Sequence, residues 1–153
     1  MKIELQKIKI KDLYNGYSNN EELGVFAFGG KLNVRPKYQR EFTYEKERQV
    51  AVIETIVAGF PLNVMYWVKN KDESFELLDG QQRTLSICRF LFGDFSISHN
   101  GTPFYFNNFQ MTTPEIAEKI MNYELMCYFC EDGTDEEKLK WFRTINIAGK
   151  VLN

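Results

Sequence analysis

The chain has 153 residues, of which 44% are hydrophobic, 15% aromatic and 26% charged, which fits one globular domain and excludes a disordered chain. The formal net charge is −2, whereas a domain that holds DNA by charge alone is usually basic. Any contact with nucleic acid would therefore be weak, local or made through a partner. No apolar run is long enough to cross a membrane, and the N-terminus lacks the apolar region of a signal peptide, so we expect a cytoplasmic protein without a membrane partner.

In chain order, the pattern begins with an extended lead-in at 1–11 and a polar loop at 15–22. A strand is expected at 31–35 and a helix at 43–59, which Thr43 would cap and Gly59 would end. Two strands follow at 62–69 and 74–78, and then a helix at 81–92 that Gly93 ends.

The second half begins with a hairpin, because Asn100-Gly101 separates short strands at 95–98 and 102–106. A helix opens at Thr113-Pro114, a strand covers 123–130, and Thr134-x-x-Glu137 is the capping box of a last helix that reaches about residue 148. Strands and helices in this mixture predict an α+β (mixed α/β) domain that spans residues 1–153.

Three cysteines argue against a disulfide framework. Cys127 and Cys130 form a C-x-x-C, but they fall in a predicted strand, where residues three apart point to opposite faces. The single histidine, His99, leaves a zinc site short of ligands. We expect all three cysteines to lie in the core.

The junction between the strand at 74–78 and the helix at 81–92 is the first candidate site. Gly80 permits a tight turn, and the helix start offers free N–H groups and positive charge to an anion. Arg83 could clamp a phosphate, and Asp79 could hold a metal-bound water, cap the helix or act as a base. Gln81 and Gln82 could orient a water or contact a base, and Thr84 adds a hydroxyl. An ordinary capped turn explains the spacing equally well.

Two further segments carry polar groups near predicted elements. The segment 35–40 offers Arg35, Lys37 and Arg40 as cations, Tyr38 as a stacking ring and Gln39 as an amide, although Lys37 fits a solvated loop better. Near the C-terminus, Asn146 falls beside the apolar stripe of the last helix, where its amide must find a partner within the fold or in a ligand.

The order of these motifs resembles a known family. The matching segments are Pro36-x-Tyr38-Gln39-Arg40, Gly59-x-Pro61-Leu62, Leu77-Leu78-Asp79-Gly80-Gln81-Gln82-Arg83-Thr84 and Phe142-x-x-x-Asn146-x-x-Gly149-x-x-Leu152. This order resembles the N-terminal domain family of GmrS/GmrD-type, modification-dependent restriction enzymes, which is similar in fold to the ParB/sulfiredoxin-like superfamily.

The resemblance implies a domain of a bacterial or phage DNA restriction and defence system that binds, and hydrolyses, a nucleoside triphosphate (NTP) with Mg²⁺. It implies catalytic roles for Asp79, Gln81, Gln82 and Arg83. The metal ligand stays open, with Asp79 as the candidate. It implies nucleotide binding by Tyr38, Gln39, Arg40, Gly80 and Arg83. To these we add Arg35, Thr84 and Asn146 as expected nucleotide-binding residues from their own chemistry.

The expected partners are the triphosphate, DNA, and a nuclease or another defence protein. Family members commonly continue into an HNH nuclease domain, which one histidine cannot supply, so we expect no such domain here. Two alternatives stay open: a ParB-like module that binds or nicks DNA, and a non-enzymatic phage or host protein that binds a defence complex.

Overall fold

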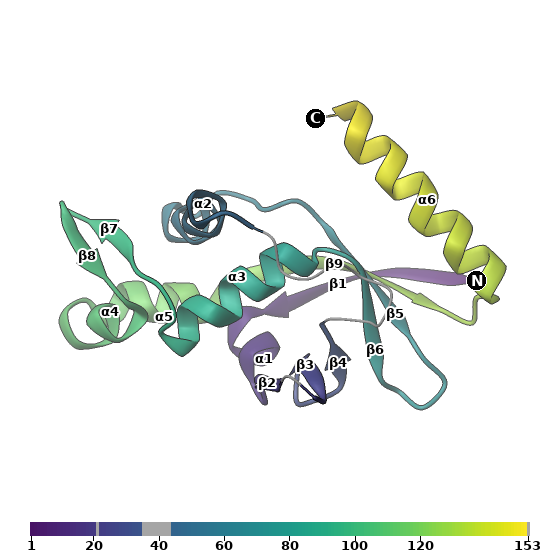
Figure 1. Cartoon of the computed structure of the whole chain (residues 1–153), viewed down its shortest axis with the longest axis horizontal. Helices are drawn as coiled ribbons and strands as arrows, with labels where there is room; N and C mark the ends of the chain where they lie inside the picture. Colours follow the sequence, from purple (N-terminus) through teal and green to yellow (C-terminus); the bar gives the residue numbers. More distant parts are fainter. Residues whose placement is uncertain (21, 35–43, 153) are drawn as a thin grey trace.

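The computed structural model describes residues 1–20, 22–34 and 44–152, with side chains as far as Ile145 (Figure 1). The elements in chain order are β1 (Lys2–Lys9), α1 (Ile10–Tyr14), β2 (Ser18–Asn20), β3 (Gly24–Ala27), β4 (Leu32–Asn33), α2 (Lys46–Ala58), β5 (Met65–Lys69), β6 (Phe75–Asp79), α3 (Gln81–Phe92), β7 (Ile97–His99), β8 (Thr102–Phe104), α4 (Phe106–Thr112), α5 (Pro114–Asn122), β9 (Glu124–Glu131) and α6 (Asp135–Leu152).

The main sheet is mixed, with strand order β1-β9-β5-β6-β4-β3-β2. β9 is parallel to β5 and β4 is parallel to β6, whereas the other neighbours pair antiparallel. β7 and β8 form a separate hairpin beside α4 and α5. The predicted α+β class is therefore confirmed.

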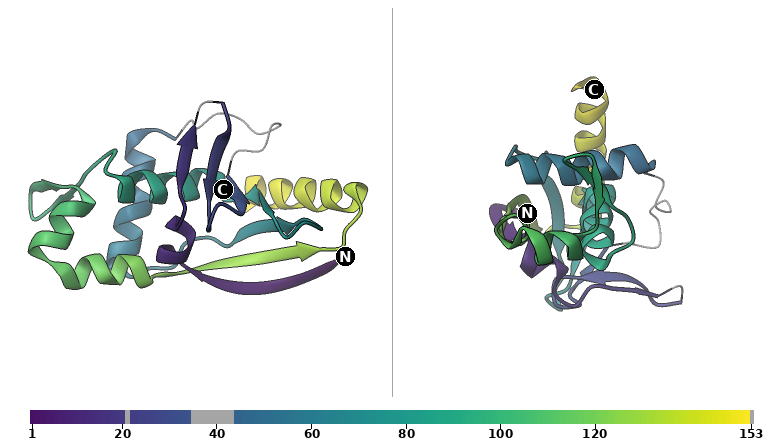
Figure 2. Two further views of the ribbon diagram at one scale, coloured as in Figure 1. Left: turned by 90° about the horizontal axis from the view of Figure 1, so that it is seen from below. Right: turned by 90° about the vertical axis from the view of Figure 1, so that its left-hand side faces the viewer.

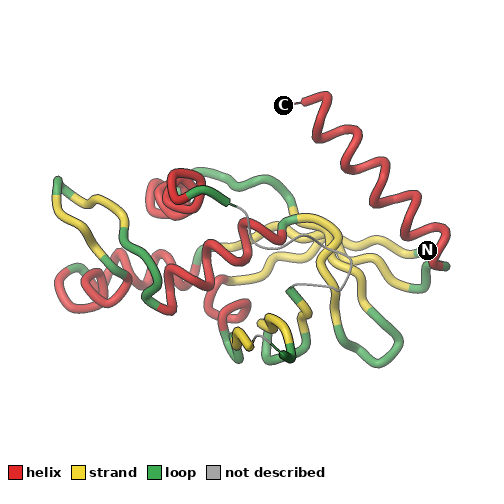
Figure 3. Tube along the Cα trace, viewed as in Figure 1, coloured by secondary structure: helices red, strands yellow, loops and turns green. Residues whose placement is uncertain are grey.

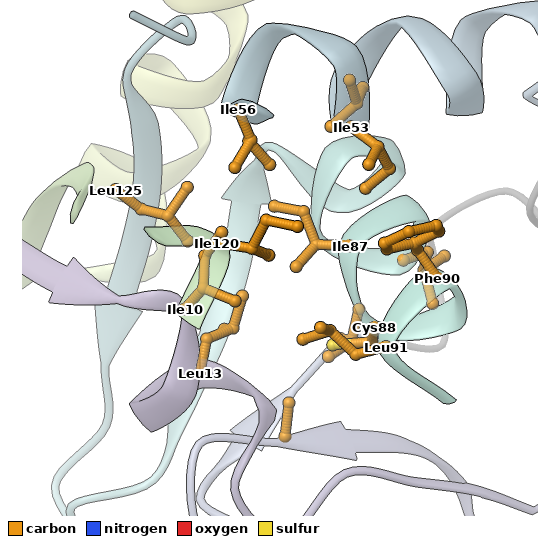
Figure 4. Close-up of a cluster of buried hydrophobic side chains, with 14 of the residues drawn as sticks. Ile10, Leu13, Ile53, Ile56, Ile87, Cys88, Phe90, Leu91, Ile120 and Leu125 are labelled. Carbon is orange, nitrogen blue, oxygen red and sulfur yellow. The ribbon is translucent and has the colours of Figure 1, made fainter. Parts of the chain in front are cut away.

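The alternation of side chains along β5 divides the core between the two faces of the sheet. Trp67 packs into the larger cluster with side chains of α1, α2, α3 and α5, some of which Figure 4 shows. Its neighbours Tyr66 and Val68 lie in a smaller cluster with Trp141 and Phe142 of α6. Figures 1 and 2 show α6 rising from the sheet as a separate arm, with its first turn beside the N-terminus.

All three cysteines are buried in the core, and Cys127 and Cys130 lie on opposite faces of the sheet, as the sequence predicted. Cys88 and Cys127 are buried in the larger cluster, and Cys130 is buried in the smaller one. Burial raises the pKa of the Cys88 and Cys127 thiols to about 12, so both are neutral, unreactive thiols at physiological pH.

Several boundaries differ from the sequence prediction. α2 begins at Lys46 with Glu45 as its N-cap residue, and the predicted cap Thr43 lies outside the described residues. α1, β2 and β3 fall in segments for which no such element was predicted, and residue 106, predicted to end a strand, begins α4. The capping box at α6 is confirmed, because Glu137 N donates to Thr134 Oγ1 and Thr134 N donates to Glu137 Oε1, both at 3.1 Å.

No helix of the described residues combines the length and apolar character needed to cross a membrane.

Candidate functional site

The start of α3 is set by a close approach between two elements. Gly80 is its N-cap residue and has φ of 104°, in the left-handed region that favours glycine. A Cβ at Gly80 would lie 2.4 Å from Met65 Cγ and 2.6 Å from Met65 Sδ on β5. Only glycine fits this position, so the packing of β5 against the turn requires Gly80.

The first turn of α3 presents N–H groups without a capping side chain in the described part of the chain. The first bond inside the helix runs from Thr84 N to Gly80 O, at 3.0 Å. The amides of Gln81, Gln82 and Arg83 precede that bond and therefore lack helical acceptors. Because Gly80 is the N-cap residue, the sequence alternative in which the Asp79 side chain caps α3 is not what the structure shows.

Gln81 places an unsatisfied donor at this helix start. Its side chain is only 7% exposed, and its Nε2 has no hydrogen-bond partner among the described residues. A buried amide N–H without an acceptor costs free energy, and such exceptions in a folded protein call for a specific explanation. The geometry thus provides several donors, from the backbone and from Gln81, for an acceptor outside the described structure.

Arg83 is held by the connection between α2 and β5. Its Nη1 donates to Asn63 O, and its Nη2 lies 3.4 Å from both Val64 O and Asp79 Oδ2. The Arg83 side chain is only 13% exposed, whereas the Asp79 side chain is 40% exposed. Arg83 therefore holds both the Asp79 carboxylate and the backbone of residues 63–64, which leads into β5. The Asp79 carboxylate remains open to solvent.

The α2–β5 connection is fixed at two further points, which Figure 3 shows as a loop. Tyr123 Oη donates to Phe60 O at 2.6 Å and accepts from Leu62 N at 3.1 Å. Lys119 Nζ donates to Val57 O at 2.9 Å. These hydrogen bonds thus tie the end of α2 and the α2–β5 connection to Lys119 of α5 and to Tyr123, contacts that no local sequence pattern predicted.

The remaining predicted site residues have different placements. Thr84 is fully buried, and its hydroxyl faces Met65 Sδ at 3.4 Å. Gln82 is half-buried, and its carbonyl accepts from Ser86 Oγ at 2.8 Å. Arg35, Tyr38, Gln39 and Arg40 lie outside the described residues, as does the side chain of Asn146.

The backbone of α6 relates Asn146 to the junction only indirectly. The Trp141 ring packs edge-on against Tyr66 at 5.4 Å, and Tyr66 is the register partner of Asp79. α6 thus contacts the sheet beside the end of β6, and Asn146 comes five positions after that contact. Proximity of the Asn146 amide to Asp79 stays a prediction.

The metal-binding side chains that lie close together limit the kind of metal site that could form here. Among the described residues, no group of three His, Cys, Asp or Glu side chains could hold a metal ion. Mg²⁺ commonly takes one or two carboxylates together with substrate phosphates and waters, so Asp79 alone fits that mode of binding. The junction suits a phosphate-bound magnesium ion and does not suit an all-protein metal cage.

Comparison with known proteins identifies the family. The family model described as "GmrSD restriction endonuclease, N-terminal domain" matches residues 10–153. No curated protein and no solved structure matches the chain, so the likeness to the ParB/sulfiredoxin-like superfamily stays a prediction. The chain belongs to the family of the GmrSD restriction endonuclease N-terminal domain.

Proposed function

We propose that this domain binds and hydrolyses a nucleoside triphosphate with Mg²⁺, within a DNA restriction system. The proposed site is the junction where β6 passes into α3. The observation that carries the proposal is the buried Gln81 Nε2, which has no acceptor among the described residues, beside the uncapped amides of α3. Phosphate oxygens are strong acceptors, and a helix N-terminus stabilises their negative charge.

The chain's own residues would divide the work at this site. The first-turn amides and Gln81 Nε2 would bind phosphate oxygens. The half-exposed Asp79 carboxylate would hold the metal ion or accept a proton from the attacking water. Mg²⁺, when bound, offsets the charge of the phosphates. Arg83 would orient Asp79 through the contact at 3.4 Å and add positive charge at the first turn.

Membership in a restriction endonuclease family supports DNA as a partner of the complete system. A net charge of −2 disfavours binding of duplex DNA by this chain through charge alone. We therefore assign DNA cleavage to a separate nuclease domain or subunit. Binding and hydrolysis of the NTP by this domain would control the activity of that nuclease.

A hydrolysis assay with matched carboxylates tests the proposal. Release of inorganic phosphate from each NTP with Mg²⁺ is measured for the wild type, Asp79→Asn and Asp94→Asn. Asp94 is the control, because it pairs with Arg89 just beyond the other end of α3 and its exposure, 36%, is close to that of Asp79. We expect Asp79→Asn to lower the rate by at least about 100-fold and Asp94→Asn to leave it unchanged. Equal rates for all three proteins would refute hydrolysis at this site.

A further inference from the structure

A second concave surface lies at the opposite end of α3 from the nucleotide junction. It is a hollow of about 480 Å³ between α1, the turn that follows α1 and the last residue of α3, and its lining includes Lys11, Asp12, Tyr14, Asn15, Tyr17 and Phe92. Because α3 runs from Gln81 to Phe92, the helix length of about 16 Å separates the hollow from the junction. The hollow is thus a different site from the proposed nucleotide site.

Aromatic rings form one wall of the hollow. The Tyr14 and Tyr17 rings are stacked, with centroids 5.7 Å apart and an interplanar angle of 28°. The Phe92 ring meets Tyr17 nearly edge-on, with centroids 6.0 Å apart, and Phe92 is 65% exposed. The face of an aromatic ring carries partial negative charge, so this wall attracts a cation and repels an anion.

The backbone beneath these rings is fixed within the fold. Tyr17 N donates to Tyr14 O at 2.9 Å, and Gly29 N donates to Asn15 O at 2.6 Å. A Cβ at Gly16, where φ is 72°, would lie 3.0 Å from the backbone of the β3–β4 connection. The turn that carries Tyr17 therefore packs closely against that connection, and a ligand would lose little free energy by ordering it.

The full charges near the hollow almost cancel. Lys11 and Asp12 have opposite charges in its lining, and Asp94 pairs with Arg89 at 3.4 Å just beyond the end of α3. The C-terminal end of a helix adds partial negative charge, equivalent to about −0.5 of an elementary charge. The helix end and the ring faces therefore decide the sign, and both favour a cation over an anion.

The tyrosine hydroxyls report the same negative surroundings. Burial, and after it the charges of Cys88 and Asp94, raise the pKa of Tyr14 and of Tyr17 above the usual value of 10.0. Both hydroxyls are therefore neutral at physiological pH, and the negative field of the Asp94 carboxylate reaches both rings. A cation in the hollow would be stabilised by that field.

We propose that the hollow binds an arginine side chain of a protein partner, with the guanidinium group stacked on Phe92. A guanidinium is flat, always charged, and carries five N–H donors without an acceptor. It can lie against the exposed ring while its edge donates to the Asp12 carboxylate and to the side-chain oxygen of Asn15, which belong to the same lining. The ammonium group of a lysine lacks the flat face, so it would stack less well.

The test is a titration of the full chain with Nα-acetyl-arginine methylamide, followed by NMR of the aromatic side chains. The corresponding citrulline compound is the control ligand, because it has nearly the same shape and no charge. We expect the arginine compound to shift the signals of Tyr14, Tyr17 and Phe92 with millimolar affinity. The citrulline compound should bind at least about fivefold more weakly, because it loses the charge-assisted contacts.

Two equally exposed phenylalanines provide matched variants. Phe92→Leu removes the ring and keeps an apolar side chain, and Phe60→Leu makes the same change at a residue that is 64% exposed and is not part of the described lining. We expect Phe92→Leu to weaken binding of the arginine compound about threefold, Phe60→Leu to leave it unchanged, and Phe92→Trp to strengthen it, because tryptophan attracts cations most. NTP binding should be unchanged in Phe92→Leu, which separates this proposal from the function of the α3 start.

Three results would overturn the proposal directly: the arginine compound does not bind, the citrulline compound binds equally well, or Phe92→Leu and Phe60→Leu have equal affinity. Tetramethylammonium, a cation without N–H donors, gives a further comparison. Tighter binding of tetramethylammonium than of the arginine compound would also overturn the proposal, because the hollow would then select a free organic cation.

Discussion

Replacing Gly80 with alanine tests whether the candidate site depends on the contact between β5 and the turn. Two penalties act on the new side chain. The φ of 104° costs an alanine roughly 1–2 kcal/mol, and a Cβ at 2.4 Å from Met65 Cγ adds an overpacking cost of about 1–3 kcal/mol. We expect the free energy of unfolding to fall by about 2–5 kcal/mol in total.

Gly93→Ala provides a matched control at the other end of the same helix. Gly93 has φ of 100° and ψ of 16°, close to the 104° and 8° of Gly80, but a Cβ at Gly93 would meet nothing within 4 Å. Its cost should therefore be the backbone strain alone, about 1–2 kcal/mol. The difference between the two variants isolates the contact with Met65.

Urea unfolding, followed by the fluorescence of Trp67, which is buried, and Trp141, which is partly buried, measures both variants. With a slope of about 2 kcal/mol per molar urea, a difference of about 2 kcal/mol separates the midpoints by about 1 M. In a Met65→Ala background the extra cost of Gly80→Ala should shrink, because the contacts at 2.4 and 2.6 Å disappear and only the Cβ contact at 2.9 Å remains. Equal midpoints for Gly80→Ala and Gly93→Ala would refute the packing account.

Three other changes follow from single contacts. Tyr123→Phe removes the hydrogen bonds of the Tyr123 hydroxyl to Phe60 O and Leu62 N, so it should lower the free energy of unfolding by about 1–3 kcal/mol. A urea midpoint equal to that of the wild type would contradict this. Thr134→Ala removes the acceptor of Glu137 N, so it should destabilise the start of α6 by about 1 kcal/mol. A urea midpoint equal to that of the wild type would count against this. Burial raises the pKa of Cys88 from 9.0 to about 12, so iodoacetamide should not label it at pH 8 until urea unfolds the chain, and rapid labelling of the native protein would contradict its burial. The free energy of unfolding should fall above about pH 9, because the thiol ionises first in the unfolded chain.

The sequence predicted those elements that carry strong local signals. The bounds of α3 follow from Gly80 and Gly93, which both adopt left-handed φ, and the β7–β8 hairpin follows from Asn100-Gly101, with φ of 53° and 78°. β4 lies within the strand predicted at 31–35, whereas β2 and β3 were not predicted, because strands of three and four residues carry too little alternation and are stabilised by pairing with neighbouring strands.

The candidate site was predictable in its residue types and only partly in its geometry. An Asp-Gly turn before an amphipathic helix indicates a close backbone approach, and the structure supplies Met65 as the side chain that makes it close. The acceptors of Arg83 come from backbone carbonyls about twenty positions earlier, which no local pattern could indicate. The same applies to Tyr123, whose hydroxyl reaches across more than sixty positions.

The most direct test of nucleotide binding compares two buried glutamines. Gln81→Met removes an amide whose Nε2 lacks a described partner, so the fold should be retained while a phosphate donor is lost. Gln49→Met removes an amide that donates to Tyr44 O at 3.0 Å, so it should lower stability and spare the site. Calorimetric titration of each Mg²⁺-bound NTP should show binding to the wild type and Gln49→Met, with at least about tenfold weaker binding to Gln81→Met. No binding to the wild type, or equal affinity for all three proteins, would contradict the account.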